Sequence, residues 1–190
     1  MHTILPYEGW LVFYDASEDE RSPFYGKQYD FSHYNQAIYN YYIDPAWDFF
    51  GSETLYMKLL YCNYHEQLAI IELMGEWNDT LYNDIMHLKR NIIDRLLRQG
   101  IRFFILIGEN VLNFHGSDDA YYEEWFDDLD EGWICALNFR PHVYQEWEKY
   151  DIDYYIHYGE SLNMLAWRTL EPLQLFEAVK NILNRRIALS

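Results

Sequence analysis

The chain has 190 residues, of which 50% are hydrophobic and 24% are charged, a composition typical of globular rather than disordered proteins. Its 14 Lys and Arg residues stand against 31 Asp and Glu residues, which leaves a formal net charge of −17. A field of this sign repels phosphate backbones and anionic lipid, so nucleic acid and membrane surfaces are both disfavoured as partners.

Cysteine usage and the amino terminus indicate the compartment. Cys62 and Cys135 both fall in predicted strands, where isolated buried thiols behave as small hydrophobic side chains in a reducing environment. The first residues do not resemble a signal peptide, and no apolar run reaches the length of a membrane span. We therefore expect a cytoplasmic protein.

The first 53 residues are unusually dense in tyrosine and other aromatic residues. Trp10–Tyr14 and Ala37–Ile43 predict strands, and the charged stretch Ser17–Gln28, which contains proline and glycine, predicts a loop between them. We interpret residues 1–53 as an aromatic β extension packed on the main domain, residues 54–190. The alternative is that its tyrosines form a binding surface, because each combines apolar area with a polar tip.

A hairpin and a long helix are predicted next. Leu55–Tyr64 alternates between apolar and polar residues and Gln67–Met74 is almost continuously apolar, which indicates two antiparallel strands. Asn78 offers an amino-terminal cap, and apolar residues then recur at helical spacing as far as Gly100, which ends the helix.

The central stretch begins with Phe103–Ile107, an apolar run too short for a core helix and typical of a buried parallel strand. Glu109–Gly116 is predicted as a polar loop, and Ser117–Asp119 offer caps for a helix over Ala120–Leu129. Open α/β sheets place functional sites in the loop that follows such a strand, so we expect the site here.

The helix over Ala120–Leu129 has one aromatic face and one acidic face. We expect Tyr122, Trp125, Phe126 and Leu129 to be buried. The acidic residues at the helix start and on its other face are interpreted as a solvated surface rather than a cation site, namely Asp118, Asp119, Glu123, Glu124, Asp127, Asp128, Asp130 and Glu131.

Strands and helices alternate to the end of the chain. The predicted elements are a strand at Trp133–Phe139, a short helix from Pro141, a strand at Asp153–Tyr158, a short edge strand at Asn163–Arg168, and a closing helix from Pro172 that Thr169 or Glu171 caps. The predicted fold class is therefore α/β, a mostly parallel sheet of βα units with an opening antiparallel hairpin and an aromatic-rich amino-terminal β extension.

This element order resembles the STAS-type domain, the fold of bacterial anti-sigma-factor antagonists and of sulfate-transporter tails. The resemblance covers roughly residues 54–188 and is carried by the segments FFILIGENVLNFHGSDDAYYEEWFDDL, ICALNFRPHVYQEWEKYDI and LEPLQLFEAVKNIL. It implies a non-enzymatic protein-binding or regulatory module.

The resemblance also implies a modification site. In that family a serine or threonine of an Asp-Ser-Ser/Thr-Gly run is phosphorylated at the start of the second helix. Here the run is His115-Gly116-Ser117-Asp118, which leaves Ser117 as the hydroxyl for phosphorylation. Asp118 and Asp119 would repel a phosphate at this position, and the alternative role for Ser117 is a helix cap.

We expect another protein to bind at the start of this helix. The candidate partner-binding residues are Asn113, His115, Ser117, Asp118, Tyr121 and Glu124. Self-association as a homodimer through an exposed aromatic edge strand is a further possibility.

No catalytic residue, cofactor or metal is predicted. Cys62 and His65 have ligand-like spacing but lack a second pair. Glu72 and Glu109 are the candidates for a carboxyl group with a raised pKa. They keep open an alternative function, a small-molecule-binding protein or enzyme with a pocket between the aromatic amino-terminal layer and the strand ends.

Overall fold

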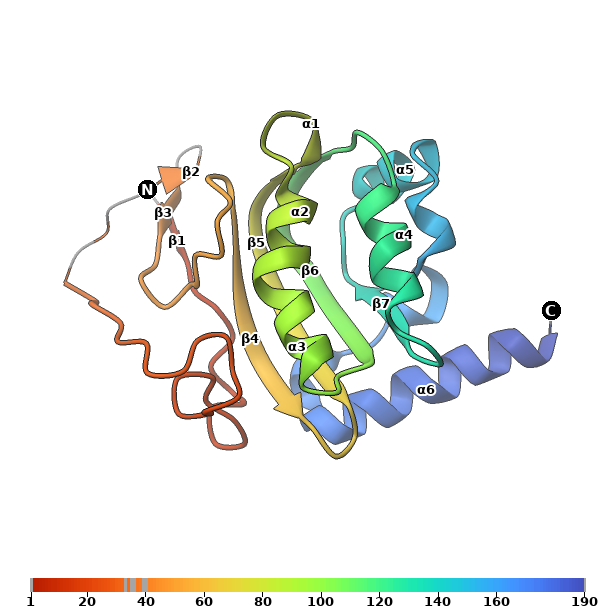
Figure 1. Cartoon of the computed structure of the whole chain (residues 1–190), viewed down its shortest axis with the longest axis horizontal. Helices are drawn as coiled ribbons and strands as arrows, with labels where there is room; N and C mark the ends of the chain where they lie inside the picture. Colours follow the sequence, from red (N-terminus) through yellow and green to blue (C-terminus); the bar gives the residue numbers. More distant parts are fainter. Residues whose placement is uncertain (1, 33, 35–36, 39–40, 190) are drawn as a thin grey trace.

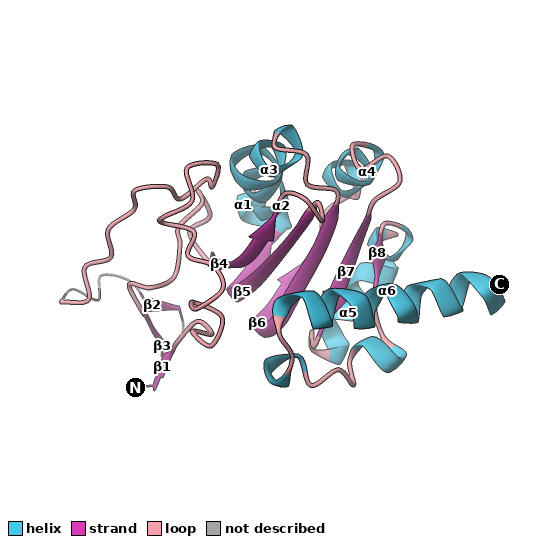
Figure 2. Cartoon of the chain, turned by 90° about the horizontal axis from the view of Figure 1, so that it is seen from below, coloured by secondary structure: helices cyan, strands magenta, loops and turns pink. Residues whose placement is uncertain are grey.

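The computed structural model describes residues 2–32, 34, 37–38 and 41–189. Its main element is a five-stranded sheet in the order β4-β5-β6-β7-β8, of which Figure 1 labels β4 to β7 and Figure 2 labels all five strands. These strands are β4 (Leu55–Asn63), β5 (Leu68–Asn78), β6 (Phe103–His115), β7 (Trp133–Leu137) and β8 (Ile156–His157). β4 is antiparallel to β5, and the following neighbours are parallel. The predicted α/β class with an opening antiparallel hairpin is confirmed.

The predicted central strand lies at the centre of this sheet. β6 pairs with β5 on one side and with β7 on the other. The side chains of Phe104 to Ile107 have no exposed area. A strand covered on both faces needs apolar residues at every position, which explains why its sequence does not alternate.

Helices cover both faces of the sheet (Figure 2). One face carries α1 (Asp79–Tyr82), α2 (Asp84–Leu88), the π-helical turn η1 (Lys89–Ile93), α3 (Asp94–Arg98) and α4 (Ala120–Asp127). α5 (Pro141–Lys149) contributes Trp147 to the core on this side. α6 (Pro172–Leu189) packs on the opposite face through Leu175, Phe176 and Val179. Apolar side chains of β5 point alternately into the two cores.

The predicted long helix is interrupted near its start. Asn83 adopts a left-handed conformation with φ 52° and ends α1, its backbone N–H donating to the carbonyl of Asp79. The chain then stays helical from Asp84 to Arg98. Gly100 has φ +90°, which a residue with a side chain adopts only at a cost, so its predicted role in ending the helix is confirmed.

Within its described residues, the amino-terminal segment contains little regular structure. Its strands are β1 (His2–Ile4), β2 (Ala37–Ile38) and β3 (Tyr41–Ile43), which form a small sheet in the order β1-β3-β2. The predicted strand over Ala37–Ile43 is thus present as two short strands, and Tyr39 and Asn40 lie outside the described residues.

The predicted strand at Trp10–Tyr14 is wrong, because this stretch forms turns in which the N–H groups of Phe13 and Tyr14 donate to the carbonyl of Trp10. Trp10 is buried, whereas Val12 and Phe13 are exposed. A single anchoring tryptophan, rather than a buried strand face, therefore holds this stretch in place.

Four further predictions are corrected by the structure. Glu109–Gly116 is not a loop, because β6 continues to His115 and pairs along the full length of the eleven-residue β5. The Asp153–Tyr158 strand shortens to β8, preceded by the 3-10 turn η2 (Ile152–Tyr154). Asn163–Arg168 is not a strand. It follows the 3-10 turn η3 (Glu160–Leu162), and its last two residues belong to the 3-10 turn η4 (Trp167–Thr169). Phe126 remains 41% exposed, because it packs against Tyr155 at the rim.

Candidate functional site

The predicted partner-binding residues come from the end of β6 and the start of α4. Asn113 and His115 lie on the strand rather than in a loop. The His115 Nε2 atom lies 2.8 Å from the Glu76 Oε1 atom on β5 and 3.0 Å from the Asn113 side-chain nitrogen. The imidazole is about half exposed, so its other edge faces solvent.

Ser117 and Asp118 are exposed between β6 and α4. The cap role falls to the acids. Asp119 occupies the N-cap position, and the Asp118 carboxylate accepts a hydrogen bond from the N–H of Ala120 at 3.1 Å. The side chain of Asp119 makes no capping hydrogen bond, so Asp118, one residue earlier, is the acid that binds the first turn of α4, and the Ser117 side chain lies at the surface.

The helical turn α1 stands beside this segment. The Thr80 hydroxyl donates to the carbonyl of Gly116 at 2.7 Å, which joins α1 to the chain just before Ser117. Two adjacent apolar side chains of α1 are exposed, Leu81 by 73% and Tyr82 by 39%. Apolar and acidic side chains therefore lie next to each other at this edge of the sheet.

A buried carboxyl group anchors α1. Asp79 is only 4% exposed, and it accepts hydrogen bonds from Tyr122 Oη, Trp77 Nε1 and the N–H of Ile85 at 2.7 to 2.9 Å. Burial raises the pKa of Asp79 to about 7 although these hydrogen bonds oppose the shift. These three hydrogen bonds hold α1 in place, and they require a carboxyl group to be buried.

Tyr121 and Glu124, the remaining predicted residues, are tied to Arg90. The two guanidinium nitrogens of Arg90 bind the Glu124 carboxylate at 2.5 and 2.7 Å, and the same group lies 5.3 Å from the centre of the Tyr121 ring. These hydrogen bonds hold the pKa of Glu124 below its ordinary value. The interpretation of this acidic face as merely solvated is thus wrong at Glu124, and it is also wrong at Asp128, which binds Lys89.

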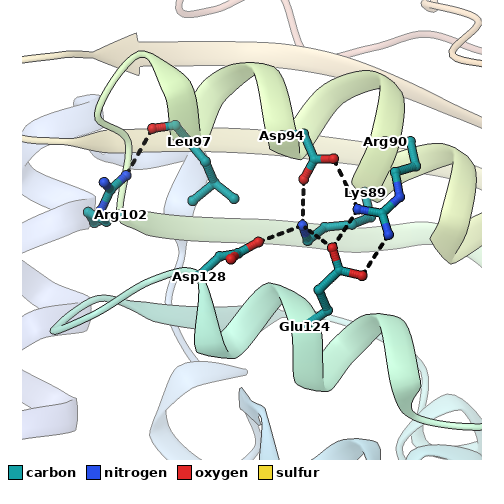
Figure 3. A network of polar contacts seen from close by, with 7 residues as sticks. All are labelled: Lys89, Arg90, Asp94, Leu97, Arg102, Glu124 and Asp128. Atoms are coloured by element: carbon teal, nitrogen blue, oxygen red, sulfur yellow. Dashed lines mark hydrogen bonds and ion pairs between the residues drawn. The ribbon is translucent and has the colours of Figure 1, made fainter.

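Arg90 belongs to a larger ion-pair network, the Lys89 cluster, which comprises Lys89, Arg90, Asp94, Glu124 and Asp128 (Figure 3). Lys89 has no exposed side-chain area, and its ammonium lies 2.5 Å from Asp94, 2.8 Å from Asp128 and 3.2 Å from Glu124. The three carboxylates offer oxygen atoms within 4.8 Å of one another, an arrangement that suits a cation. The ammonium of Lys89 stands among them and links η1 and α3 to α4.

A second polar group, the Glu72 cluster, lies on the face of the sheet that α6 covers. Glu72 has no exposed area, and it accepts hydrogen bonds from the N–H of Tyr7 at 2.8 Å and from Asn110 at 3.1 Å. An Arg168 nitrogen lies 3.9 Å from Glu72 and 2.5 Å from Glu109. Burial raises the pKa of Glu72 to about 7. The two acids that the sequence singles out thus share one arginine.

A cavity lies between the amino-terminal segment and β4. Its volume is about 250 Å³, and its lining includes Tyr7, Tyr29 and Lys58. Lys58 pairs with Glu72 in the antiparallel register, so their side chains share the same face of the sheet. The cavity therefore borders the middle of an edge strand, whereas the sequence predicts a pocket at the strand ends.

Sequence reasoning missed three charged residues that organise these groups, namely Lys58, Lys89 and Arg168. A weak signal exists for two of them. Lys58 is the only charged residue of the predicted strand Leu55–Tyr64, and Lys89 follows Leu88 on the stripe that faces the core. Arg168 lies in the short 3-10 turn η4, and no local sequence pattern distinguishes it from a solvated side chain.

No family model matches this sequence, and no curated protein matches it either. Among solved structures, the anti-sigma factor antagonist SpoIIAA in its unphosphorylated form is similar with a TM-score of 0.44 and 14% identity, over 55% of this chain and 88% of that chain. The Bacillus cell fate determinant SpoIIAA in the phosphorylated form is similar with a TM-score of 0.40 and 15% identity, over 55% of this chain and 91% of that chain. SpoIIAA is of the STAS type, the family that the sequence resembles.

Among the described residues, no helix is both long enough and apolar enough to cross a membrane.

Proposed function

We propose that this chain is a non-enzymatic protein-binding module whose docking surface consists of Leu81, Tyr82, His115, Ser117 and Asp118. The partner is another protein, with a basic patch and a shallow apolar pocket. Asn113 supports His115 from β6, and Tyr121 and Glu124 border the surface on α4. The docking surface lies within the domain formed by residues 54–190. We propose that residues 1–53 are an extension packed on that domain.

The anchoring of α1 carries this proposal. The turn is held by Asp79, a buried carboxyl with three hydrogen bonds, yet the side chains that it presents, Leu81 and Tyr82, are exposed. Burying an acid lowers the stability of the fold, and an exposed pair of apolar side chains does not offset that loss. A rigid turn that presents apolar side chains loses little entropy on binding, which favours recognition.

Charge favours a basic partner. Asp118 is exposed beside the apolar pair, and the net charge of −17 attracts cationic surfaces over long distances. Phosphate on Ser117 would add negative charge at the same position, so we propose Ser117 as a site whose modification changes partner affinity. Phosphopeptide mapping of the protein from its native cells tests this point, and an unmodified Ser117 would contradict it.

Site-specific photo-crosslinking tests the docking surface. A benzophenone amino acid replaces Tyr82 in cells, and the same group at Tyr154, which is 75% exposed on η2, is the matched control. We expect a defined adduct from position 82 alone and its loss in Asp118→Lys. Equal adducts from both positions, or an adduct that Asp118→Lys leaves unchanged, would contradict the proposal. An adduct with a second copy of the chain would indicate a homodimer instead.

A further inference from the structure

The cavity beside β4 has the walls of a small-molecule site and is independent of the docking surface. Its volume of about 250 Å³ lies just below the usual range of about 300 to 1,000 Å³ for ligand pockets, which limits it to a compact ligand. Apolar groups dominate its walls, with Pro6, Leu11 and Phe31 beside the rings of Tyr7 and Tyr29. Pockets of this kind bind a compact ligand by ring contacts and choose among ligands through a few polar groups.

Lys58, the cation of this cavity, already has partners. Its ammonium donates to the Tyr29 hydroxyl and to the carbonyl of Ala46, both at 3.0 Å, and lies 4.1 Å from the centre of the Tyr29 ring. The buried carboxylate of Asp48 stands 3.7 Å away. Burial lowers the pKa of Lys58, whereas Asp48 opposes that shift. The Asp48 carboxylate is therefore the protein's own counter-charge for this ammonium.

Asp48 has a second cationic partner, which completes this inner group. Lys27 binds Asp48 Oδ1 at 2.5 Å, and the Tyr29 hydroxyl donates to the same oxygen at 2.9 Å. Tyr29 thus connects Lys58 to Asp48 and presents its ring to the cavity. The inner group holds the ring in place before any ligand arrives.

Two further acids line the cavity, Glu8 and Asp15. Asp15 Oδ1 accepts hydrogen bonds from the N–H and the hydroxyl of Ser17, at 2.8 and 2.7 Å. With Asp48 they make three carboxylates against the two ammonium groups of Lys27 and Lys58. The surroundings of the cavity therefore carry one excess negative charge.

We propose that this cavity binds a small aromatic amine, with its ring against Tyr7, Tyr29 and Phe31 and its ammonium toward Asp15. The aromatic walls pack against the ring of the ligand. The carboxylate of Asp15, rather than an aromatic face, attracts its ammonium, because Lys58 already lies 4.1 Å from the centre of the Tyr29 ring. The excess negative charge then selects a cation over an anion of the same shape. The volume suits a six-membered ring with a short side chain.

The test compares 2-phenylethylamine with 3-phenylpropionate, which have the same ring and opposite charge, by titration of the full chain followed by NMR. We expect saturable binding of the amine about tenfold tighter than that of the acid, since one charge pair near a protein surface supplies a difference of this order. NMR contacts between protons of the bound amine and protons of the Tyr29 and Phe31 rings must place the amine in this cavity. Equal affinities, tighter binding of the acid, or contacts elsewhere would overturn the proposal.

A variant pair separates a local charge effect from the overall field. Asp15→Asn keeps the Oδ1 acceptor for Ser17 and removes the charge, and Asp127→Asn on α4 makes the same change in net charge at an exposed position. We expect the first to weaken amine binding about fivefold to tenfold and the second to leave it unchanged. Equal losses in both would show that the amine responds only to the net charge. If Asp15→Asn does not fold, the comparison of amine and acid on the unaltered chain decides.

Discussion

Replacing Glu72 by glutamine should change how stability depends on pH. The Glu72 side chain has no exposed area, and burial raises its pKa from the ordinary 4.5 to about 7, against the opposing effects of the Tyr7 N–H and Arg168. Between these two values the folded chain keeps a proton that the unfolded chain has lost. The resulting stabilisation is complete below about pH 4.5 and is lost as pH rises through about 7.

The magnitude of this pH dependence follows from the difference between the pKa values of Glu72 in the folded and unfolded chain. At about 1.4 kcal/mol per pH unit, a pKa of about 7 against 4.5 makes up to roughly 3 kcal/mol of unfolding free energy dependent on pH. Glutamine has the same shape, does not titrate, and keeps an acceptor oxygen for the N–H of Tyr7. Asp79 contributes in the same direction in both proteins, so the difference between them isolates Glu72.

Urea unfolding followed by tryptophan fluorescence measures this difference at several values between pH 4.5 and 8.5. We expect the unfolding free energy of Glu72→Gln to rise relative to that of the unaltered protein, by up to roughly 3 kcal/mol across that range. Glu123→Gln, at an exposed position on α4, controls for the loss of one charge. Parallel curves for Glu72→Gln and the unaltered protein would refute the assignment of a buried titrating carboxyl group.

Other substitutions test the remaining parts of the structure. Lys89→Met should lower the unfolding free energy by about 2 kcal/mol in the same assay, because three partly exposed carboxylates lose their cation. Millimolar Ca²⁺ should restore part of that free energy by binding the same carboxylate oxygen atoms. Unchanged stability would contradict a structural role for the Lys89 cluster. Trp10→Ala should cost about 3 kcal/mol and expose residues 1–53 to proteolysis, since its ring packs against Trp167 and its Nε1 donates to the carbonyl of Leu170 at 2.9 Å. Gly100→Ala should cost about 1 kcal/mol, because its φ of +90° strains a residue with a side chain, and a neutral result would contradict this. Leu81→Ser should change stability by less than about 0.5 kcal/mol while abolishing the crosslink at position 82, and a large loss of stability would show that its role is structural.

Several features of the fold were accessible from the sequence because they depend on neighbouring residues. The periods of apolar residues identified the hairpin, the helix that ends at Gly100 and the buried strand at Phe103–Ile107. The closing helix begins at Pro172 as predicted, with the side chain of Gln174 accepting the N–H of Glu171. Glu72 stood out because an acid in an apolar strand is rare.

Long-range pairing decided the rest. β6 continues past Gly108 because β5 beside it extends to Asn78, and the ladder between them satisfies polar backbone groups that a local pattern assigns to a loop. Trp10 reached the core through an irregular turn, which has no sequence period.

The charged groups show the same division most clearly. Lys89 meets Glu124, and Arg168 meets Glu109, only when their helices, turns and strands pack, and each pair is separated by dozens of residues along the chain. The sequence by itself determined which segments would be buried, because burial follows local hydrophobic patterns. Only the tertiary structure decided which charges would meet, because a buried charge is stable solely beside a partner that the fold supplies.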